Sequence, residues 1–413
     1  MLKPLLVCIS AQNVRTRDAV TFVFCSFCGG AGFTPAMVRR VECSWVMRSA
    51  LPTGGWIFRR DGEISLGYQL RLLADFFEGK TELMAATEKD VWIGFDLGGT
   101  KMLTIAYQND WKVVGRRRRK TRGREGAESG VQRIITTIHR LLEECEIDSE
   151  RIAGIGIGCP GPIDLDTGCI LTTPNLGWDD VEIGKSLKKE FGCPVRVVND
   201  VDAGVFGEYQ FGAAKDSRCV VGIFPGTGVG GGCVYEGRIL QGAGVSCMEV
   251  GHTRISSSSR SSGYKLPGTV EAEGSRLTIA AEAAKAAHRG DAPYLAKTVG
   301  TDLAEIRSGA LANSIANGDK VIQDLVEEAA TAIGLAVVNI VHLLAPDKIV
   351  LGGGLVEAME DLMVGTVRET ARKNVMSVYR DRFDVVAANL GDDAGVLGAC
   401  AWARQEITRS KQA

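Results

Sequence analysis

The chain reads VWIGFDLGGTKMLTIAYQ over residues 91–108, where two apolar segments flank a turn that contains two glycines. This pattern predicts a strand, a tight turn and a second strand. It is not the dinucleotide-binding fingerprint, in which a helix follows the glycines. The amides of Gly98 and Gly99 and the hydroxyl of Thr100 can face a phosphate, and Asp96 can orient a hydrated magnesium ion. An ordinary hairpin loop is the alternative.

A second segment of the same kind is CVVGIFPGTGVGGGCVYEG, residues 219–237. Five of the seven residues at 226–232 are glycines, and so many glycines raise the entropic cost of folding. A glycine-rich bulge could explain them, but two such hairpins favour a duplicated pair of domains that hold one phosphate chain between them.

A third glycine cluster, Gly352 to Gly354, follows an apolar strand at residues 347–351 and precedes a predicted helix from about Leu355. Backbone amides at the start of a helix can approach a nucleotide, here its adenosine. A tight strand-to-helix turn is the alternative.

Between and after the hairpins, polar residues stand at the ends of apolar segments. The strand at residues 195–198 leads into Asn199 and Asp200, where a carboxylate could meet a bound hydroxyl. The same pair would also make a good helix N-cap. Further on, Glu249 and His252 lie in the segment MEVGH, in a chain that has only four histidines.

The bulk composition is that of a two-domain globular protein of 413 residues, 45% hydrophobic and 24% charged. The net charge of −2 does not favour nucleic acid or an anionic membrane as a partner. No apolar run reaches the roughly 18 residues of a membrane span. The 12 cysteines are scattered, which favours reduced thiols and a cytoplasmic location.

Residues 1–83 differ from the rest of the chain, since they hold seven of the 13 phenylalanines but little periodicity before a possible helix at residues 64–80. Cys25 and Cys28 have the spacing of half a zinc site, but no second pair follows. We expect natural translation to begin at Met84, which makes residues 1–83 an atypical leader; a genuine extension is the alternative. The expected domains are residues 84–208 and 209–413, with the last helix able to pack on the first domain.

Taken together, the motifs resemble the ROK family of repressors, uncharacterised reading frames and sugar kinases. The resemblance covers about residues 91–405 and keeps the family's order of motifs. These are DLGGTK (96–101), CPGPID (159–164), TTPNLGW (172–178), VVNDVDAG (197–204), FPGTGVGGG (224–232), EVGHT (249–253), VLGGG (350–354) and LGDDAGVLGA (390–399).

The resemblance implies an actin-like ATPase (ribonuclease H-like) fold, with two α/β domains around a nucleotide and sugar cleft. It implies ATP-dependent phosphorylation of a hexose, glucose favoured, at the 6-hydroxyl, with Asp200 as catalytic base and Mg²⁺ reached by Asp96 through water. The implied sugar ligands beside Asp200 are Asn175, Asn199, Glu249, His252 and Glu271. The implied phosphate contacts are Asp96, Gly98, Gly99, Thr100 and Lys101 on one side, and Gly226, Thr227 and Gly228 on the other.

One departure from the family pattern concerns zinc. Many members join the histidine of the EVGH segment to three cysteines, and the corresponding positions here are Ser262, Tyr264 and Thr269. These side chains cannot replace thiolates in a tetrahedral zinc site. We therefore expect no structural zinc and assign His252 to the sugar alone.

Other functions within and outside the kinases stay open. Fructose, N-acetylmannosamine or allose could replace glucose, and polyphosphate could replace ATP. A sugar-responsive repressor needs two helices around a short turn, which residues 1–83 do not show, and a non-catalytic sugar binder is disfavoured by the intact motifs. The basic run at residues 116–120 is interpreted as a solvated strand end. A homodimer or homotetramer is expected, as is common in the family.

Overall fold

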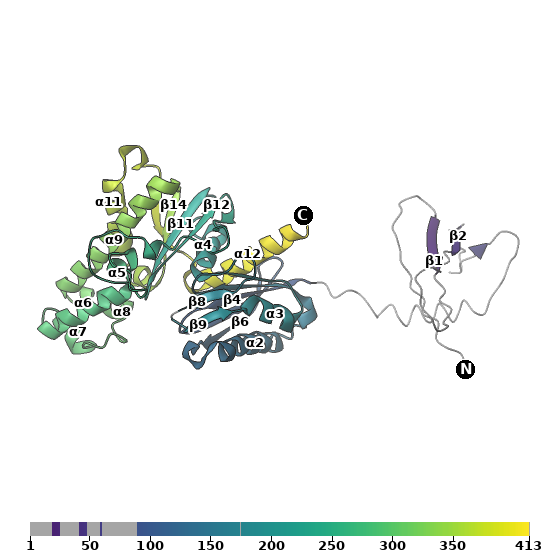
Figure 1. Ribbon diagram of the computed structural model, residues 1–413, viewed down its shortest axis with the longest axis horizontal. Coiled ribbons are helices and arrows are strands. Elements are labelled where there is room, and N and C mark those ends of the chain that lie inside the picture. The colour runs from purple at the N-terminus through teal and green to yellow at the C-terminus, as the bar shows by residue number, and fades with distance from the viewer. Residues whose placement is uncertain (1–18, 25–40, 48–57, 60–88, 174, 413) are drawn as a thin grey trace. The chain divides into compact units, whose positions relative to one another are not determined.

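The computed structural model describes residues 19–24, 41–47, 58–59, 89–173 and 175–412, and divides the chain into two units, Met1–Ala86 and Thr87–Ala413 (Figure 1). In the first unit, β1 (Ala19–Phe24), β2 (Val41–Met47) and β3 (Phe58–Arg59) form an antiparallel sheet. The predicted helix at residues 64–80, the Cys25–Cys28 pair and Met84 lie outside the described residues.

The second unit begins with a five-stranded sheet in the order β10-β7-β4-β5-β6. Its strands are β4 (Val91–Leu97), β5 (Lys101–Gln108), β6 (Val113–Lys120), β7 (Ile152–Cys159) and β10 (Val195–Asn199). The first three are antiparallel, and β7 and β10 continue the sheet in parallel from β4. A small ribbon of β8 (Ile170–Thr173) and β9 (Trp178–Val181) lies beyond its carboxyl end.

Helices cover both faces of this sheet, and the sequence of its strands shows which face is which. On β5, Met102 and Ala106 belong to the core under α2 (Ala127–Glu144), whereas Leu103 and Ile105 pack with α12 (Ala394–Ser410). This alternation follows from the two-residue period of a strand. The remaining helix of this region is α3 (Ile183–Phe191).

The glycines of β7 explain how α12 comes so close. In the segment IAGIGIGC the isoleucines at 155 and 157 fill the α2 side, and glycines take the opposite side. A Cβ at Gly156 would stand 2.0 Å from the carbonyl oxygen of Ala399 in α12. Only glycine therefore permits this helix-to-sheet contact.

A second sheet repeats the topology of the first, in the order β13-β12-β11-β14-β15. Its strands are β11 (Cys219–Pro225), β12 (Val229–Tyr235), β13 (Arg238–Ile239), β14 (Lys348–Leu351) and β15 (Asp384–Ala387). Again three antiparallel strands are followed by two parallel ones. The shared order agrees with the duplication that the paired hairpins suggested.

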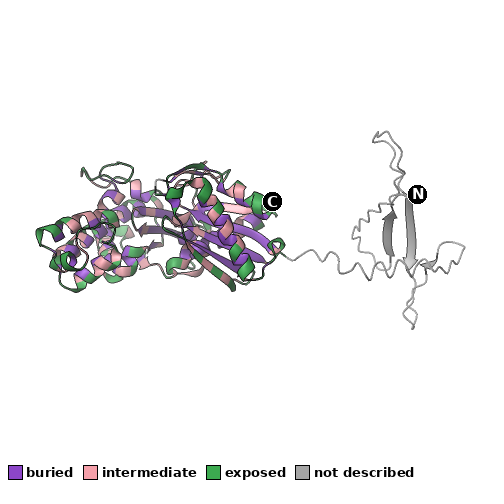
Figure 2. Ribbon diagram, turned by 90° about the horizontal axis from the view of Figure 1, so that it is seen from below, coloured by how far each residue is buried: buried purple, intermediate pink, exposed green. Residues whose placement is uncertain are grey.

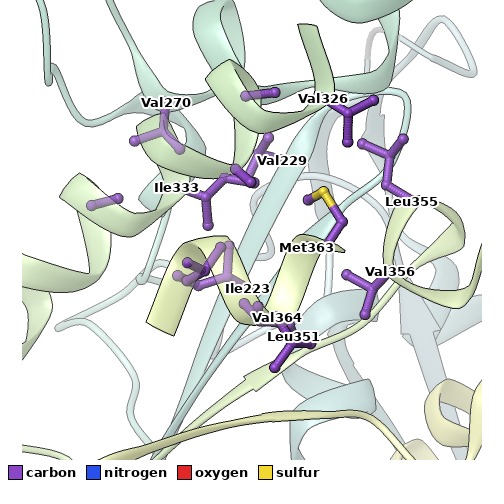
Figure 3. Packing of buried hydrophobic residues seen from close by; sticks show 14 of the residues in the cluster. Ile223, Val229, Val270, Val326, Ile333, Leu351, Leu355, Val356, Met363 and Val364 are labelled. Carbon is purple, nitrogen blue, oxygen red and sulfur yellow. The ribbon is translucent and has the colours of Figure 1, made fainter. Parts of the chain in front are cut away.

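The second sheet is covered by a layer of helices around α9, which has 25 residues (Figure 1). They are α5 (Val270–Gly274), α6 (Arg276–Arg289), α7 (Pro293–Thr298), α8 (Ser308–Ala316), α9 (Lys320–Leu344), α10 (Gly354–Ala358) and α11 (Glu360–Asn374). By length and hydropathy α9 could cross a membrane. Its Val326 and Ile333 instead pack with Ile223 of β11 and Met363 of α11 in one apolar core (Figure 3).

The two sheets are joined through α4 (Asp200–Phe211), which packs on β11, β12 and α12. The boundary expected after residue 208 therefore falls inside α4. The last helix, α12, lies on the first sheet, and the buried residues of Figure 2 follow the strands and the inward faces of these helices (Figure 2).

Candidate active site

A cavity of about 750 Å³ lies where β10, the second hairpin and the segments around Glu249 and Glu271 meet. Its walls include every residue that was assigned to the sugar: Asn175, Asn199, Asp200, Glu249, His252 and Glu271. The turn of the second hairpin contributes three further wall residues: Gly226, Thr227 and Gly228. Residues as far apart in the sequence as Asn175 and Glu271 therefore line the same cavity.

Asp200 stands at the junction of β10 and α4. Asn199 is the N-cap of α4, and its side-chain oxygen accepts hydrogen bonds from the amides of Val201 (2.9 Å) and Asp202 (3.2 Å). The capping role is therefore real, and it holds Asp200 at the cavity wall. Burial raises the pKa of Asp200 to about 6, while the amide of Val201, which donates to its carboxylate at 3.0 Å, opposes the rise.

The first hairpin does not line this cavity, although it lies beside it. Its turn, Gly98 to Thr100, connects β4 to β5, and a Cβ at Gly99 would be 3.8 Å from Asn175. The side chain of Lys101 is occupied by Asp392, at 2.7 Å. Burial and the charge of Asp200 raise the pKa of Asp96, at the end of β4, to about 7.

The turn of the second hairpin is shorter than its run of five glycines predicts. Its turn is Gly226 to Gly228, closed by a hydrogen bond from the amide of Gly226 to the carbonyl of Gly228 (2.8 Å). The other three glycines lie within β12. A Cβ at Gly230 would come within 2.4 Å of Val201 in α4, so these glycines allow close packing of strand and helix.

Glu271 links this hairpin to the serine-rich loop at residues 253–269. One carboxylate oxygen accepts a hydrogen bond from the amide of Val229 and the other from the amide of Gly263, both at 3.1 Å. Beside it, burial raises the pKa of Glu249, whereas His252 lowers it. The Nδ1 atom of His252 is buried without a hydrogen-bond partner among the described residues.

The positions that correspond to zinc-binding cysteines have other roles here. Thr269 caps α5, and the ring of Tyr264 lies edge-on to His252 with centroids 4.8 Å apart. Glu273 accepts hydrogen bonds from Ser256 and Arg260, both at 3.0 Å. Hydrogen bonds to Glu271 and Glu273 thus order the serine-rich loop. The absence of structural zinc stays a prediction.

The third glycine cluster borders a separate cavity of about 250 Å³, whose wall includes Phe224, Gly352, Gly353 and Glu357. Gly353 has a φ of +82°, which favours glycine. The following helix, α10, is only five residues long. The backbone turn, more than a helix dipole, therefore shapes this cavity, and Phe224 belongs to the walls of both cavities.

Two side chains at the site were missed from the sequence. The guanidinium of Arg276, at the start of α6, donates a hydrogen bond to the Thr227 hydroxyl at 3.1 Å, and burial lowers its pKa. Asp202 lies behind Asp200 with 2% exposure, and burial raises its pKa well above the usual value. Arg276 stands outside the motifs of the sequence, whereas Asp202 lies within VVNDVDAG, two residues after Asp200, and only the folded structure shows that it is buried beside that carboxylate.

The fold and the site define a class of protein: two α/β lobes of the actin-like ATPase fold, with a polar cavity beside a glycine-rich hairpin. Residues 92–406 match the model of the ROK family. The chain belongs to the ROK family.

Several relatives support that assignment. The chain is 30% identical over 317 residues to a glucokinase from Thermotoga maritima, covering 76% of this chain and 98% of the relative. It is 25% identical over 325 residues to a xylose repressor from Caldicellulosiruptor bescii, covering 78% and 81%. The crystal structure of a ROK family glucokinase from Streptomyces griseus in complex with glucose and AMPPNP matches with a TM-score of 0.66 and 26% identity, over 76% of this chain and 99% of that one.

Proposed function

We propose that this protein is an ATP-dependent hexose kinase that phosphorylates the 6-hydroxyl of glucose, with Asp200 as general base. The observation that carries the proposal is the single cavity in which Asp200 meets five hydrogen-bonding side chains and the turn of the second hairpin. Similarity to glucokinases, one of them in complex with glucose and AMPPNP, supports the choice of substrates.

Asp200 has the properties that this role requires. With a pKa of about 6, it is mostly ionised at pH 7 and still basic enough to accept a proton, which is the compromise that general base catalysis favours. Asn199 fixes its position through the α4 N-cap. Most of the rate enhancement is expected from positioning and charge stabilisation, because phosphoryl transfer has a loose transition state.

Asp96 fits the expected magnesium ion. It offers carboxylate oxygens beside the first hairpin. The charge of Asp200 contributes to the raised pKa of Asp96, and a bound cation would reduce the repulsion between these two carboxylates. Magnesium is commonly bound through one or two carboxylates together with water and substrate phosphates, so the single carboxylate of Asp96 is sufficient for the protein's share. When bound, magnesium would neutralise charge on the β- and γ-phosphates.

The donor is proposed to lie between the two cavities. Its phosphates would contact the turn at Gly226 to Gly228, and its adenosine would occupy the cavity beside Gly352 and Gly353. Phe224 borders both spaces, so the two cavities adjoin each other. Polyphosphate would not need the adenosine cavity.

The test is release of ADP by the full chain with ATP, magnesium and single hexoses: glucose, fructose, N-acetylmannosamine and allose. We expect turnover with glucose, lowered by about 10²–10⁴ in Asp200→Asn, and a fall in kcat/KM below pH 6 as the base is protonated. Turnover with another hexose alone would correct the substrate. Near-normal turnover in Asp200→Asn would contradict the assigned base, and silence with every sugar would favour polyphosphate as donor, a repressor or a sugar binder.

A further inference from the structure

The basic run at residues 116–120 forms most of β6, the edge strand of the first sheet. Three of its four arginines are neutralised by carboxylates. The pairs are Arg116–Asp393 (2.8 Å), Arg118–Asp392 (2.9 Å) and Arg117–Glu144. The partners lie on alternate sides, as the two-residue period of a strand predicts: Asp392 and Asp393 just before α12 on one side, and Glu144 of α2 on the other. These three arginines are compatible with the solvated strand end predicted from the sequence, and each also forms an ion pair.

Arg119 differs from the other three because it makes no ion pair with a described residue, although Arg117 also has a buried nitrogen, Nε, without a hydrogen-bond partner there. Arg119 lies on the α2 side, and its Nη1 atom is buried without a hydrogen-bond partner in the part of the chain that the structure describes. Burial lowers its pKa, and so do the charges of Arg140, Arg133, Arg117 and Arg122. A buried guanidinium nitrogen without a partner costs free energy, and its neighbours add repulsion instead of relief.

The cations surround a cavity of about 280 Å³. Its lining residues are Arg119, Lys120, Arg122 and Arg133. Within the described residues, the ion pairs of this wall involve one carboxylate, that of Glu125, which pairs with Arg133 and, at 3.6 Å, with Arg122. The charge of this wall therefore exceeds what the adjacent acid can neutralise.

We propose that these four side chains bind a small anion that carries a phosphate group with two or more negative charges. Guanidinium groups suit such a ligand, because their planar N–H donors bind phosphate oxygens in pairs. The shared chemistry fits both a phosphomonoester and a short inorganic polyphosphate. A cavity lined by only four side chains favours a small ion over nucleic acid, which binds through many phosphate contacts along an extended surface.

The proposed site adjoins the first hairpin without belonging to the large cavity. Arg133 donates a hydrogen bond to the carbonyl of Thr121 (2.7 Å), and the Thr121 hydroxyl donates to the carbonyl of Gly98 (2.6 Å). Two hydrogen bonds therefore connect Arg133 to the turn of the first hairpin, and an anion that binds Arg133 would bind next to this connection. The site is defined by its own side chains, so it does not depend on the proposed kinase activity.

The experiment is isothermal titration of the full chain at constant ionic strength with tripolyphosphate and, separately, with glycerol phosphate. The variants are Arg119→Met and, as a matched loss of one positive charge, Arg380→Met, an exposed arginine near the end of α11. Both variants keep the large cavity intact, so binding there cancels from the comparison. We expect Arg380→Met to bind like the wild type and Arg119→Met to bind at least about tenfold more weakly, as for loss of a charge-assisted hydrogen bond.

The two ligands distinguish the sources of the phosphate, since preference for one of them names its class. If Arg119→Met does not fold, Arg122→Gln, at an exposed wall residue, takes its place with the same expectation. Equal affinities in Arg119→Met and Arg380→Met would overturn the proposal, as would a wild type that binds neither ligand. Tighter binding of a 20-nucleotide RNA than of tripolyphosphate would overturn the assignment to a small ion.

Discussion

At the scale of single residues, the site is built on carboxyl groups that the fold makes difficult to ionise. Burial raises the pKa of Asp200 to about 6 and, together with Asp200, that of Asp96 to about 7. The same environment that weakens these acids makes Asp200 a better proton acceptor at neutral pH. Stability is therefore given up where the proposed chemistry occurs.

This trade-off predicts a pH-dependent effect of Asp96→Asn. The pKa of Asp96 is higher in the folded than in the unfolded chain, so its contribution to stability is complete below pH 4 and lost as the pH rises through 7. Relative to the wild type, Asp96→Asn should gain roughly 1–3 kcal/mol in free energy of unfolding at pH 8 and nothing at pH 4. Urea denaturation at both values measures it.

Asp90 supplies a control of opposite sign. Its pKa is lowered, mainly by the hydrogen bond from Arg151, so its stabilisation is present at neutral pH and lost as the pH falls through the folded pKa. Asp90→Asn should therefore be less stable than the wild type at pH 8. The same gain for Asp96→Asn at pH 4 as at pH 8 would contradict the burial argument.

Arg276 carries the second prediction at this scale. Its guanidinium donates to Thr227 in the proposed phosphate-binding turn, so we expect it to contact the donor rather than the sugar. Arg276→Met should raise the KM for ATP by about 10–100-fold, as for loss of a hydrogen bond to a charged group, with the KM for glucose changed less than about twofold. Initial rates with each substrate varied in turn measure this split. A change confined to the KM for glucose would show that Arg276 serves the other substrate.

At the scale of elements, the crossing of α4 and α12 depends on two glycines. A Cβ at Gly398 would stand 1.8 Å from the carbonyl oxygen of Ala203, and one at Gly207 would stand 2.4 Å from that of Ala394. Because α4 begins at Asp200 and α12 lies on the first sheet, this contact fixes the proposed base relative to both sheets. Even one added methyl group must separate the helices.

We therefore expect Gly398→Ala to be destabilising by about 1–3 kcal/mol, the usual cost of overpacking, or more if the helices cannot move. Gly365→Ala in α11 is the matched control, because nothing lies within 4 Å of its would-be Cβ. That substitution should stabilise by about 0.5–1 kcal/mol through helix propensity. Thermal unfolding of both variants measures the contrast, and equal effects would mean that the crossing is not tight.

The elements also show how far sequence reasoning reaches. The strands and both hairpins could be predicted, because apolar segments and glycine turns are local signals. The residues gathered around Asp200 were expected only through the resemblance to the ROK family. The role of Gly230 could not be predicted from the sequence, because this glycine allows close packing on α4 and does not belong to the turn. Likewise the pairing of Lys101 with Asp392 joins positions 291 residues apart, and only the folded chain brings them together.

At the scale of the whole second unit, two sheets of one topology surround the site, and α4 and α12 join them. Each sheet contributes one glycine hairpin near the carboxyl end of its strands, where ligands bind in open α/β folds. A donor held by both hairpins would thus contact both lobes. This arrangement suits a kinase whose lobes close around its substrates to exclude water.

The last prediction concerns residues 1–83, the atypical leader that precedes the expected translation start at Met84. Each residue proposed for sugar, phosphate or magnesium lies between Asp96 and Gly354, and the second unit begins at Thr87. Its first sheet is complete from Val91 onward. A protein that starts at Met84 should therefore match the full chain in kcat and in KM for both substrates within about twofold, since no group that stabilises the transition state is removed, and it should keep the same thermal unfolding midpoint for the second unit. Parallel assays and calorimetry of the two proteins measure this. A loss of activity larger than tenfold in the shorter protein, with its unfolding midpoint unchanged, would show that the leader contributes to catalysis, and would contradict a start at Met84.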